Sequence, residues 1–358
     1  MELKPGLGTA AMLPILAALL TGALPQAHAV PHSDDPGGDS GAPATPAVVV
    51  RRDAAPPVQA QLQTQADQAG HGHDDSIAVL YPDIGEPYRK VFTEIIDGIE
   101  RQTHLPVRGY PVADHAESAD LQAALKRNGA KVIIALGRQG VKAAAAMTGT
   151  PVIVGGVSSV PEEDKLDGIS LTPDPSLLFA RLKNLLPAVR RVIVVYNPQN
   201  SEPLIRLARE AARVEGLELV ALEASDLAAA VRHYESACAG ADSRLDALWL
   251  PPDATTVDES TILPLVLRES WERNLPIFSS SVLHVKKGAL FALFPNNTEL
   301  GRDLAKLATA VLGGEPQKHG VTPLRAVRTA FNWRTASHIG LNMDANQQRG
   351  FDFLYPEP

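Results

Sequence analysis

After Ser76 the sequence alternates short runs of β-branched and other apolar residues with longer amphipathic stretches. The first run covers residues 77–81, and in the stretch that follows it Val91, Ile95 and Ile99 fall on one helical face. Strand-like runs separated by helical stretches predict βαβ units and a mostly parallel sheet. The chain is therefore expected to fold as an α/β protein.

The same alternation starts a second time near residue 176. Each series of runs spans about 100 residues, which is a common size for a domain. We therefore predict two doubly wound parallel-sheet lobes. The expected strands cover residues 77–81, 107–111, 132–136 and 151–154 in the first series, and 191–196, 217–222, 247–250 and 276–278 in the second.

Composition agrees with two cores and excludes several classes of protein. Of 358 residues, 45% are hydrophobic, which is enough for one large or two ordinary cores and excludes a wholly disordered chain. The net charge of -8 leaves no basic footprint for a nucleic acid, so no nucleic-acid partner is expected. Because Cys238 is the single cysteine, the chain has no disulfide framework and no cysteine-rich metal site.

The first 29 residues have the pattern of a secretory signal peptide. Lys4 precedes an apolar stretch from about residue 10 to residue 24, and Ala27-His28-Ala29 suits a signal peptidase. A membrane anchor is the alternative, but Pro14 interrupts the stretch, which is shorter than the roughly 20 residues of a spanning helix. We predict export to the periplasm with cleavage, and no lipid anchor because no cysteine lies near this segment.

Residues 30–75 are rich in Pro, Ala, Gly, Gln and Asp and lack apolar periodicity. Such a segment cannot bury enough surface to offset its chain entropy, so we predict a disordered leader or linker. His71 and His73 near its end could bind a metal, but no further ligands follow at fixed spacing, so a solvated tail that happens to contain histidines is the preferred interpretation.

Candidate binding residues lie where the expected strands end. In parallel α/β sheets, ligands bind beyond the carboxyl ends of the strands. These loops are rich in hydroxyl and amide groups, which suits a small polar ligand better than acid–base catalysis. Some of the same side chains are good helix caps, and Arg138 is either a surface arginine or the partner of a ligand carboxylate. The candidates are Asp83, Gly85, Arg138, Gln139, Val157, Ser158, Ser159, Tyr196, Asn197, Asp253, Ala254, Thr255, Ser279 and Ser280.

Enzyme signatures are missing from the sequence. It contains no G-x-S-x-G elbow, no phosphate loop of the G-x-x-x-x-G-K-[ST] type, no H-E-x-x-H helix and no G-x-G-x-x-G after the first expected strand. We predict no catalytic residue, no cofactor and no resident metal. An exported α/β hydrolase is the least favoured alternative, and Asp83 with Asp253 is the one titratable pair that it could use.

A family resemblance rests on an ordered set of short motifs. The chain resembles the substrate-binding proteins of ABC transporters that include tryptophan- and tyrosine-binding members. The resemblance covers residues 76–343. The motifs that carry it are Val195-Tyr196-Asn197-Pro198, Leu250-Pro251-Pro252-Asp253, Pro276-Ile277-Phe278-Ser279, Gly288-Ala289-Leu290-Phe291, Glu299-Leu300-Gly301-Arg302, Leu312-Gly313-Gly314-Glu315-Pro316, Asn332-Trp333-Arg334-Thr335-Ala336 and Ile339-Gly340-Leu341.

The resemblance implies the fold of a type I periplasmic binding protein, with two lobes joined by a hinge of three segments. The first lobe would hold residues 76–172 and 294–319, the second 173–293 and 320–345, and 346–358 would form a C-terminal tail. The crossovers would fall near residues 171–173, near 294–296 and after Gly320.

By the same resemblance, the lobes would clamp an amino acid or a similar small molecule, with Asp253 as the acidic partner of its amine. The protein would be a monomer that delivers its ligand to an ABC permease. A sensor of the same fold that acts with a receptor is the alternative. Residues 156–159 lack the aspartate–proline pair that the family often has there, and the loops offer few aromatic rings, so an aromatic amino acid is not the expected ligand.

Overall fold

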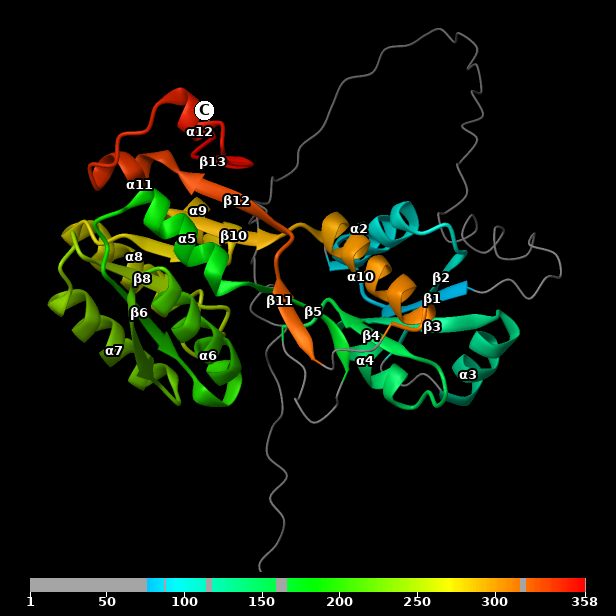
Figure 1. Ribbon diagram of the computed structural model, residues 1–358. Coiled ribbons are helices and arrows are strands. Elements are labelled where there is room, and N and C mark those ends of the chain that lie inside the picture. The colour runs from blue at the N-terminus through cyan, green and yellow to red at the C-terminus, as the bar shows by residue number, and fades with distance from the viewer. Residues whose placement is uncertain (1–75, 87, 114–117, 159–165, 316–319, 358) are drawn as a thin grey trace, which may run out of the picture. The chain divides into compact units, whose positions relative to one another are not determined.

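The computed structural model describes residues 76–86, 88–113, 118–158, 166–315 and 320–357. The predicted signal peptide, the leader with His71 and His73, and the candidate Ser159 lie outside these ranges. Within them the chain forms two α/β sheets (Figure 1). Across the described ranges, no helix combines the length and the apolar composition that a membrane crossing requires.

The first sheet has six strands in the order β11-β5-β4-β3-β1-β2, and every neighbouring pair is parallel. Its strands are β1 (Ser76–Pro82), β2 (Val107–Val112), β3 (Ala130–Leu136), β4 (Val152–Gly155), β5 (Asp167–Pro173) and β11 (Val321–Leu324). Its helices are α2 (Tyr88–Gln102), α3 (Ser118–Arg127), α4 (Gly137–Ala145) and α10 (Asn297–Leu312).

Alternation along β1 explains why helices cover both faces of this sheet. Ile77 and Val79 pack with residues of α2 and α10, whereas Ala78 and Leu80 pack with residues of α3 and α4. Successive side chains of a strand point to opposite faces, so a run that is apolar throughout needs a helical layer on each side. Figure 1 shows α2 and α10 side by side over one face.

The second sheet has seven strands in the order β13-β12-β10-β9-β8-β6-β7. The pair β10–β12 is antiparallel and the other pairs are parallel. Its strands are β6 (Arg191–Tyr196), β7 (Glu218–Glu223), β8 (Asp246–Leu250), β9 (Ile277–Ser279), β10 (Phe291–Pro295), β12 (Val327–Asn332) and β13 (Phe353–Tyr355). Its helices are α5 (Pro175–Leu185), α6 (Pro198–Val214), α7 (Leu227–Gly240), α8 (Ile262–Arg273), α9 (Val282–Lys287), α11 (Trp333–His338) and α12 (Ala345–Gln348).

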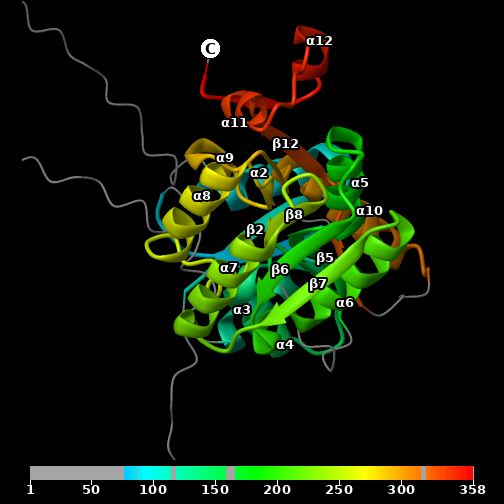
Figure 2. The same cartoon turned by 90° about the vertical axis from the view of Figure 1, so that its left-hand side faces the viewer.

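Helices again cover both faces of this sheet. Along β6, Val192 and Val194 pack with α5 and α6, while Ile193 and Val195 pack with α7 and α8. Figure 2 shows α6 and α7 beside β6 and β7. Both sheets therefore repeat one doubly wound arrangement, in which the second strand lies at one edge and the first, third, fourth and fifth follow in order. The predicted fold class is confirmed.

Two C-terminal segments differ from the sequence prediction. β11 was expected in the second lobe but pairs with β5 in the first sheet, so the chain crosses between the sheets at residues 325–326 instead of directly after Gly320. The expected tail contains β13, which pairs with β12. Pro323 fits the observed position of β11, because proline is tolerated in a strand at the edge of a sheet.

Candidate ligand-binding site

Two loops of the second sheet are joined through Asp253, which follows β8 and is 3% exposed. Its Oδ2 accepts hydrogen bonds from the backbone N–H of Asn197 at 2.8 Å and from Ser201 Oγ at 2.8 Å. Its Oδ1 accepts from the backbone N–H of Thr255 at 3.0 Å. The carboxylate therefore fixes the loops after β6 and β8 against each other, and most of its accepting capacity is already used by the protein.

Asn197 and Thr255 belong to the same network. Asn197 is the N-cap of α6, and its Oδ1 accepts from the backbone N–H of Gln199 at 2.9 Å. Thr255 Oγ1 accepts from Asn200 Nδ2 at 3.1 Å. The structure thus brings Asn197, Asp253, Ala254 and Thr255 together, and it assigns Asn197 the capping role that the sequence left open.

Tyr196 stands apart from its neighbours in the loop. Its side chain is fully buried in the core of the second sheet, and its Oη lies 2.9 Å from Glu202 Oε2 and 3.2 Å from Glu223 Oε1. Burial and then the Glu202 carboxylate raise the pKa of the phenol. The prediction that Tyr196 contacts a ligand gains no support from this position, because the side chain is buried and protein carboxylates already hold its hydroxyl group.

At the end of β9, Ser279 begins a chain of polar contacts that the sequence did not reveal. Its Oγ lies 2.7 Å from Nδ1 of His284, and Nε2 of His284 lies 2.9 Å from Oε1 of Glu259. Lys287 forms an ion pair with the other oxygen of Glu259. Because an ionised carboxylate only accepts, Nε2 of His284 carries a hydrogen, and in the neutral ring Nδ1 then accepts from the serine hydroxyl.

A hydrolytic triad has the same order of serine, histidine and glutamate, but the serine of this network lacks the exposure of an active nucleophile. Ser279 is 1% exposed, and its Oγ also accepts from the backbone N–H of Ser281 at 3.1 Å. A nucleophile must be reachable by the substrate. The geometry instead fixes the loop between β9 and α9. The neighbouring Ser280 differs, since its Oγ is buried and has no hydrogen-bond partner among the described residues.

The Glu259 carboxyl has a strongly shifted pKa. The hydrogen bond from His284 is the largest cause and, together with Lys287, lowers the pKa from 4.5 to about 2, while partial burial acts in the opposite direction. A carboxylate of this kind stabilises the folded state fully above the unfolded-state pKa, and the contribution is lost as the pH falls from about 4.5 towards 2.

We expect the free energy of unfolding to decrease across that pH range and the decrease to be smaller in Glu259→Gln. Urea unfolding at a series of pH values measures both slopes. Glu210→Gln is the control, because Glu210 forms an exposed ion pair with Arg213 on α6. Identical slopes for Glu259→Gln and the unmodified protein would contradict the assigned role of Glu259.

The candidate loops of the first sheet carry fewer internal bonds. Asp83 and Gly85 are exposed in the loop after β1, and Arg138 is exposed in the first turn of α4. Val157 is buried, whereas Ser158 is exposed. The backbone of this last pair is fixed, since Val157 O accepts from Leu171 N at 2.7 Å and Ser158 O accepts from Thr172 Oγ1 at 3.2 Å.

Two glycines bring the loops after β3 and β4 close together. Gly137 has a φ of +67° and Gly156 a φ of +68°, and residues other than glycine rarely adopt this left-handed backbone conformation. A Cβ on Gly137 would lie 2.9 Å from Pro82 Cγ, and one on Gly156 would lie 3.3 Å from the backbone N of Gly137. No side chain among the described residues caps the start of α4, which follows Leu136 directly. Gln139 in this turn is engaged with other parts of the protein.

A sequence model of the family described as ABC transporter substrate binding protein matches residues 111–344, which is more than half of the chain. The chain belongs to this family. No curated protein matches the sequence.

Several solved structures share the fold. One is an ABC domain in complex with L-Trp from Streptococcus pneumoniae, at 17% identity and a TM-score of 0.51, covering 78% of this chain and 99% of that one. Another is a ligand-free, open substrate-binding protein with adhesive properties from Clostridium difficile, at 17% identity and a TM-score of 0.54, covering 78% and 98%. A conserved domain protein from Vibrio cholerae has 17% identity and a TM-score of 0.50, covering 79% and 100%.

Family membership fits the chemistry of the described loops. The family is one of substrate-binding proteins and not of enzymes. The part of the chain that the structure describes holds no cluster of three or more His, Cys, Asp or Glu side chains suited to a metal.

Sequence reasoning missed His284, Glu259 and Lys287. The one signal was their position, since His284 and Lys287 lie within ten residues of Ser279 on a short helix.

Proposed function

We propose that this substrate-binding protein is exported and delivers a small polar ligand to an ABC permease. The family match carries the general statement. The pattern of residues 1–29 supports export through a cleaved signal peptide to the periplasm. The two doubly wound sheets support binding beyond the carboxyl ends of their strands, where proteins of this architecture bind their ligands.

The first lobe supplies the anion-binding part of the proposed site. The start of α4 lacks a side-chain cap within the described residues, and Arg138 is exposed in its first turn. A helix N-terminus with an adjacent arginine favours a carboxylate, because the backbone N–H groups, the helix dipole and the guanidinium all attract negative charge. Gly137 and Gly156 let the loops after β3 and β4 pack closely against the protein, which fixes the backbone at the start of α4. The uncapped start of α4 beside Arg138 is the observation that carries this proposal.

The second lobe supplies hydroxyl and amide groups. The Asp253 network holds the loops after β6 and β8, so their backbone groups are fixed before a ligand arrives. Ser280 Oγ is buried without a partner among the described residues, which is costly, so a movement of the loop after β9 that exposed it to a ligand would satisfy this hydroxyl group. An amino acid or a similar carboxylate-bearing molecule fits these groups. We propose that hinge bending brings the two lobes onto it.

A screen by thermal unfolding tests the proposal. Purified protein is heated with amino acids, small carboxylates, nucleobases and metal ions, and hits are confirmed by calorimetric titration. A ligand at 100 times its Kd stabilises the folded state by about 2.7 kcal/mol. A carboxylate-bearing hit supports the proposal, whereas binding of uncharged compounds alone, or of none, contradicts it. A hit that is bound but not imported by cells with the gene intact would favour the sensor alternative.

Arg138→Ala is expected to weaken binding of the identified carboxylate ligand by about 10- to 100-fold, since a charge-assisted hydrogen bond is lost. Lys142→Ala is the matched control, because Lys142 lies in the last turn of the same helix and carries the same charge. Titration calorimetry measures both affinities. Equal affinities for Arg138→Ala and Lys142→Ala would remove Arg138 from the site.

A further inference from the structure

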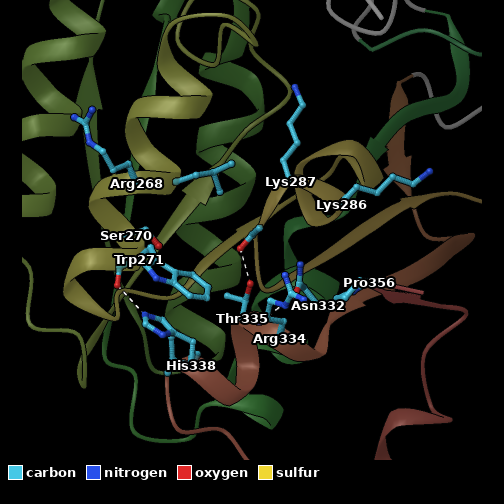
Figure 3. A pocket seen from close by; sticks show the side chains of 13 residues that line it. Arg268, Ser270, Trp271, Lys286, Lys287, Asn332, Arg334, Thr335, His338 and Pro356 are labelled. Carbon is cyan, nitrogen blue, oxygen red and sulfur yellow. Dashed lines mark hydrogen bonds between the residues drawn. The ribbon is translucent and has the colours of Figure 1, made fainter. Parts of the chain in front are cut away.

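A hollow of about 440 Å³ lies on the second lobe. It is formed by the last turns of α8 and α9 together with α11 and the C-terminal segment (Figure 3). Its apolar lining comes from Leu267, Trp271, Ile339 and Pro356. Its size falls within the range of sites that accept small molecules or short segments of chain.

The titratable side chains that line the hollow are all basic. They are Arg268, Lys286, Lys287, Arg334 and His338, and no Asp or Glu is among the described residues that line it. A cluster of basic side chains is unexpected on a protein with a net charge of -8, because like charges repel and acidic residues outnumber basic ones in this chain.

Carboxylates near the hollow neutralise it only in part. Glu269 pairs with Arg268 at 3.2 Å, and Glu259 pairs with Lys287. Lys286 and Arg334 have no carboxylate partner within the described ranges, and the Lys286 ammonium lies 5.3 Å from the centre of the Tyr355 ring. Two exposed cations are therefore free to bind an external anion.

An aromatic pair forms one wall of the hollow. The rings of Trp271 and His338 stack with centroids 3.6 Å apart and planes 5° apart, and His338 Nε2 donates to the carbonyl of Trp271 at 2.8 Å. Trp271 nevertheless remains 44% exposed. A large exposed aromatic side chain held in one orientation is typical of interaction surfaces, where it gives contact area at low entropic cost.

We propose that this hollow binds an acidic segment of a partner protein. The cationic groups come from three helices, and in Figure 3 Lys286, Lys287 and Arg268 extend in different directions from the hollow. Groups that diverge in this way suit an extended segment with several carboxylates better than one compact anion, which requires convergent donors. Opposite charges across such a surface speed association and select the partner.

The test uses the purified protein and a fluorescein-labelled peptide of eight glutamates, followed by fluorescence anisotropy. Saturable binding that weakens with added salt is expected. The double variant Lys286→Glu/Arg334→Glu should lower the affinity by at least about tenfold. The control is Lys306→Glu/Arg209→Glu, which reverses two exposed charges on α10 and α6 and makes the same change in net charge. It should change the affinity less than about twofold.

Three results would overturn the proposal. The first is an absence of peptide binding to the unmodified protein, and the second is an equal loss of affinity in the control variant, which would show an effect of net charge alone. The third is complete displacement of the peptide by citrate or pyrophosphate at concentrations too low for the peptide itself to saturate the protein. That result would make the hollow a site for small anions. The inference is independent of the ligand-binding proposal, since Lys286 and Arg334 lie outside the loops assigned to the ligand.

Discussion

Gly301→Ala is expected to destabilise the first lobe by about 3 kcal/mol. A Cβ on Gly301 would lie 2.0 Å from the backbone oxygen of Ile95 and 3.0 Å from the Cα of Gly98. Both neighbours are main-chain atoms of α2, so the new methyl group cannot be accommodated by rotating a side chain. The helices α2 and α10 must move apart, and the buried contacts of Leu300 and Leu304 with Ile95 and Ile99 loosen with them.

Gly313→Ala provides the control on the same helix. Gly313 ends α10 with a φ of -73°, and the nearest atom to an added Cβ is the oxygen of Ala310 at 3.4 Å. Alanine should be tolerated there within about 0.5 kcal/mol. Urea unfolding measures both variants. A Gly301→Ala variant as stable as Gly313→Ala would show that α2 and α10 are not packed as closely as the structure indicates.

The α/β class followed from the sequence because its cause is local. Apolar runs of strand length, each followed by an amphipathic stretch, must be buried between helical layers, and β1 and β6 show this directly. The close approach of Gly98 and Gly301 had no local cause. The two residues are far apart in sequence, and a glycine within a helical pattern gives no information about its partner in another helix.

For the candidate site residues, the position in the chain could be predicted from the sequence but the contacts of the side chain could not. A loop position can be predicted from the end of a strand, so Asn197, Asp253 and Thr255 were expected at one edge and do lie together. The direction of a side chain depends on which residues surround it. Tyr196 ends β6 on the same face as Val192 and Val194, where Glu202 and Glu223 meet its hydroxyl group, and Ser279 is held by His284. These contacts arise only once the strands and helices are assembled.

Trp249 in β8 is the largest fully buried side chain among the described residues. Its ring makes an edge-to-face contact with Phe179 at 5.6 Å and lies parallel to Phe278 at 6.5 Å. Trp249→Ala should lower the free energy of unfolding by about 3–5 kcal/mol, since it removes a large side chain and leaves a cavity. The loop that holds Asp253 follows β8 directly, so the variant should also bind ligand less tightly.

Trp249→Phe separates packing from hydrogen bonding at this position. The indole Nε1 is buried and has no hydrogen-bond partner among the described residues. Phenylalanine removes that unsatisfied donor, which offsets part of the lost packing, so a cost within about 1.5 kcal/mol is expected. Urea unfolding should therefore rank Trp249→Phe far closer to the unmodified protein than Trp249→Ala. A cost of Trp249→Phe well above about 1.5 kcal/mol would contradict this account, because it would show that the indole N–H has a partner, such as a buried water, that phenylalanine cannot hold.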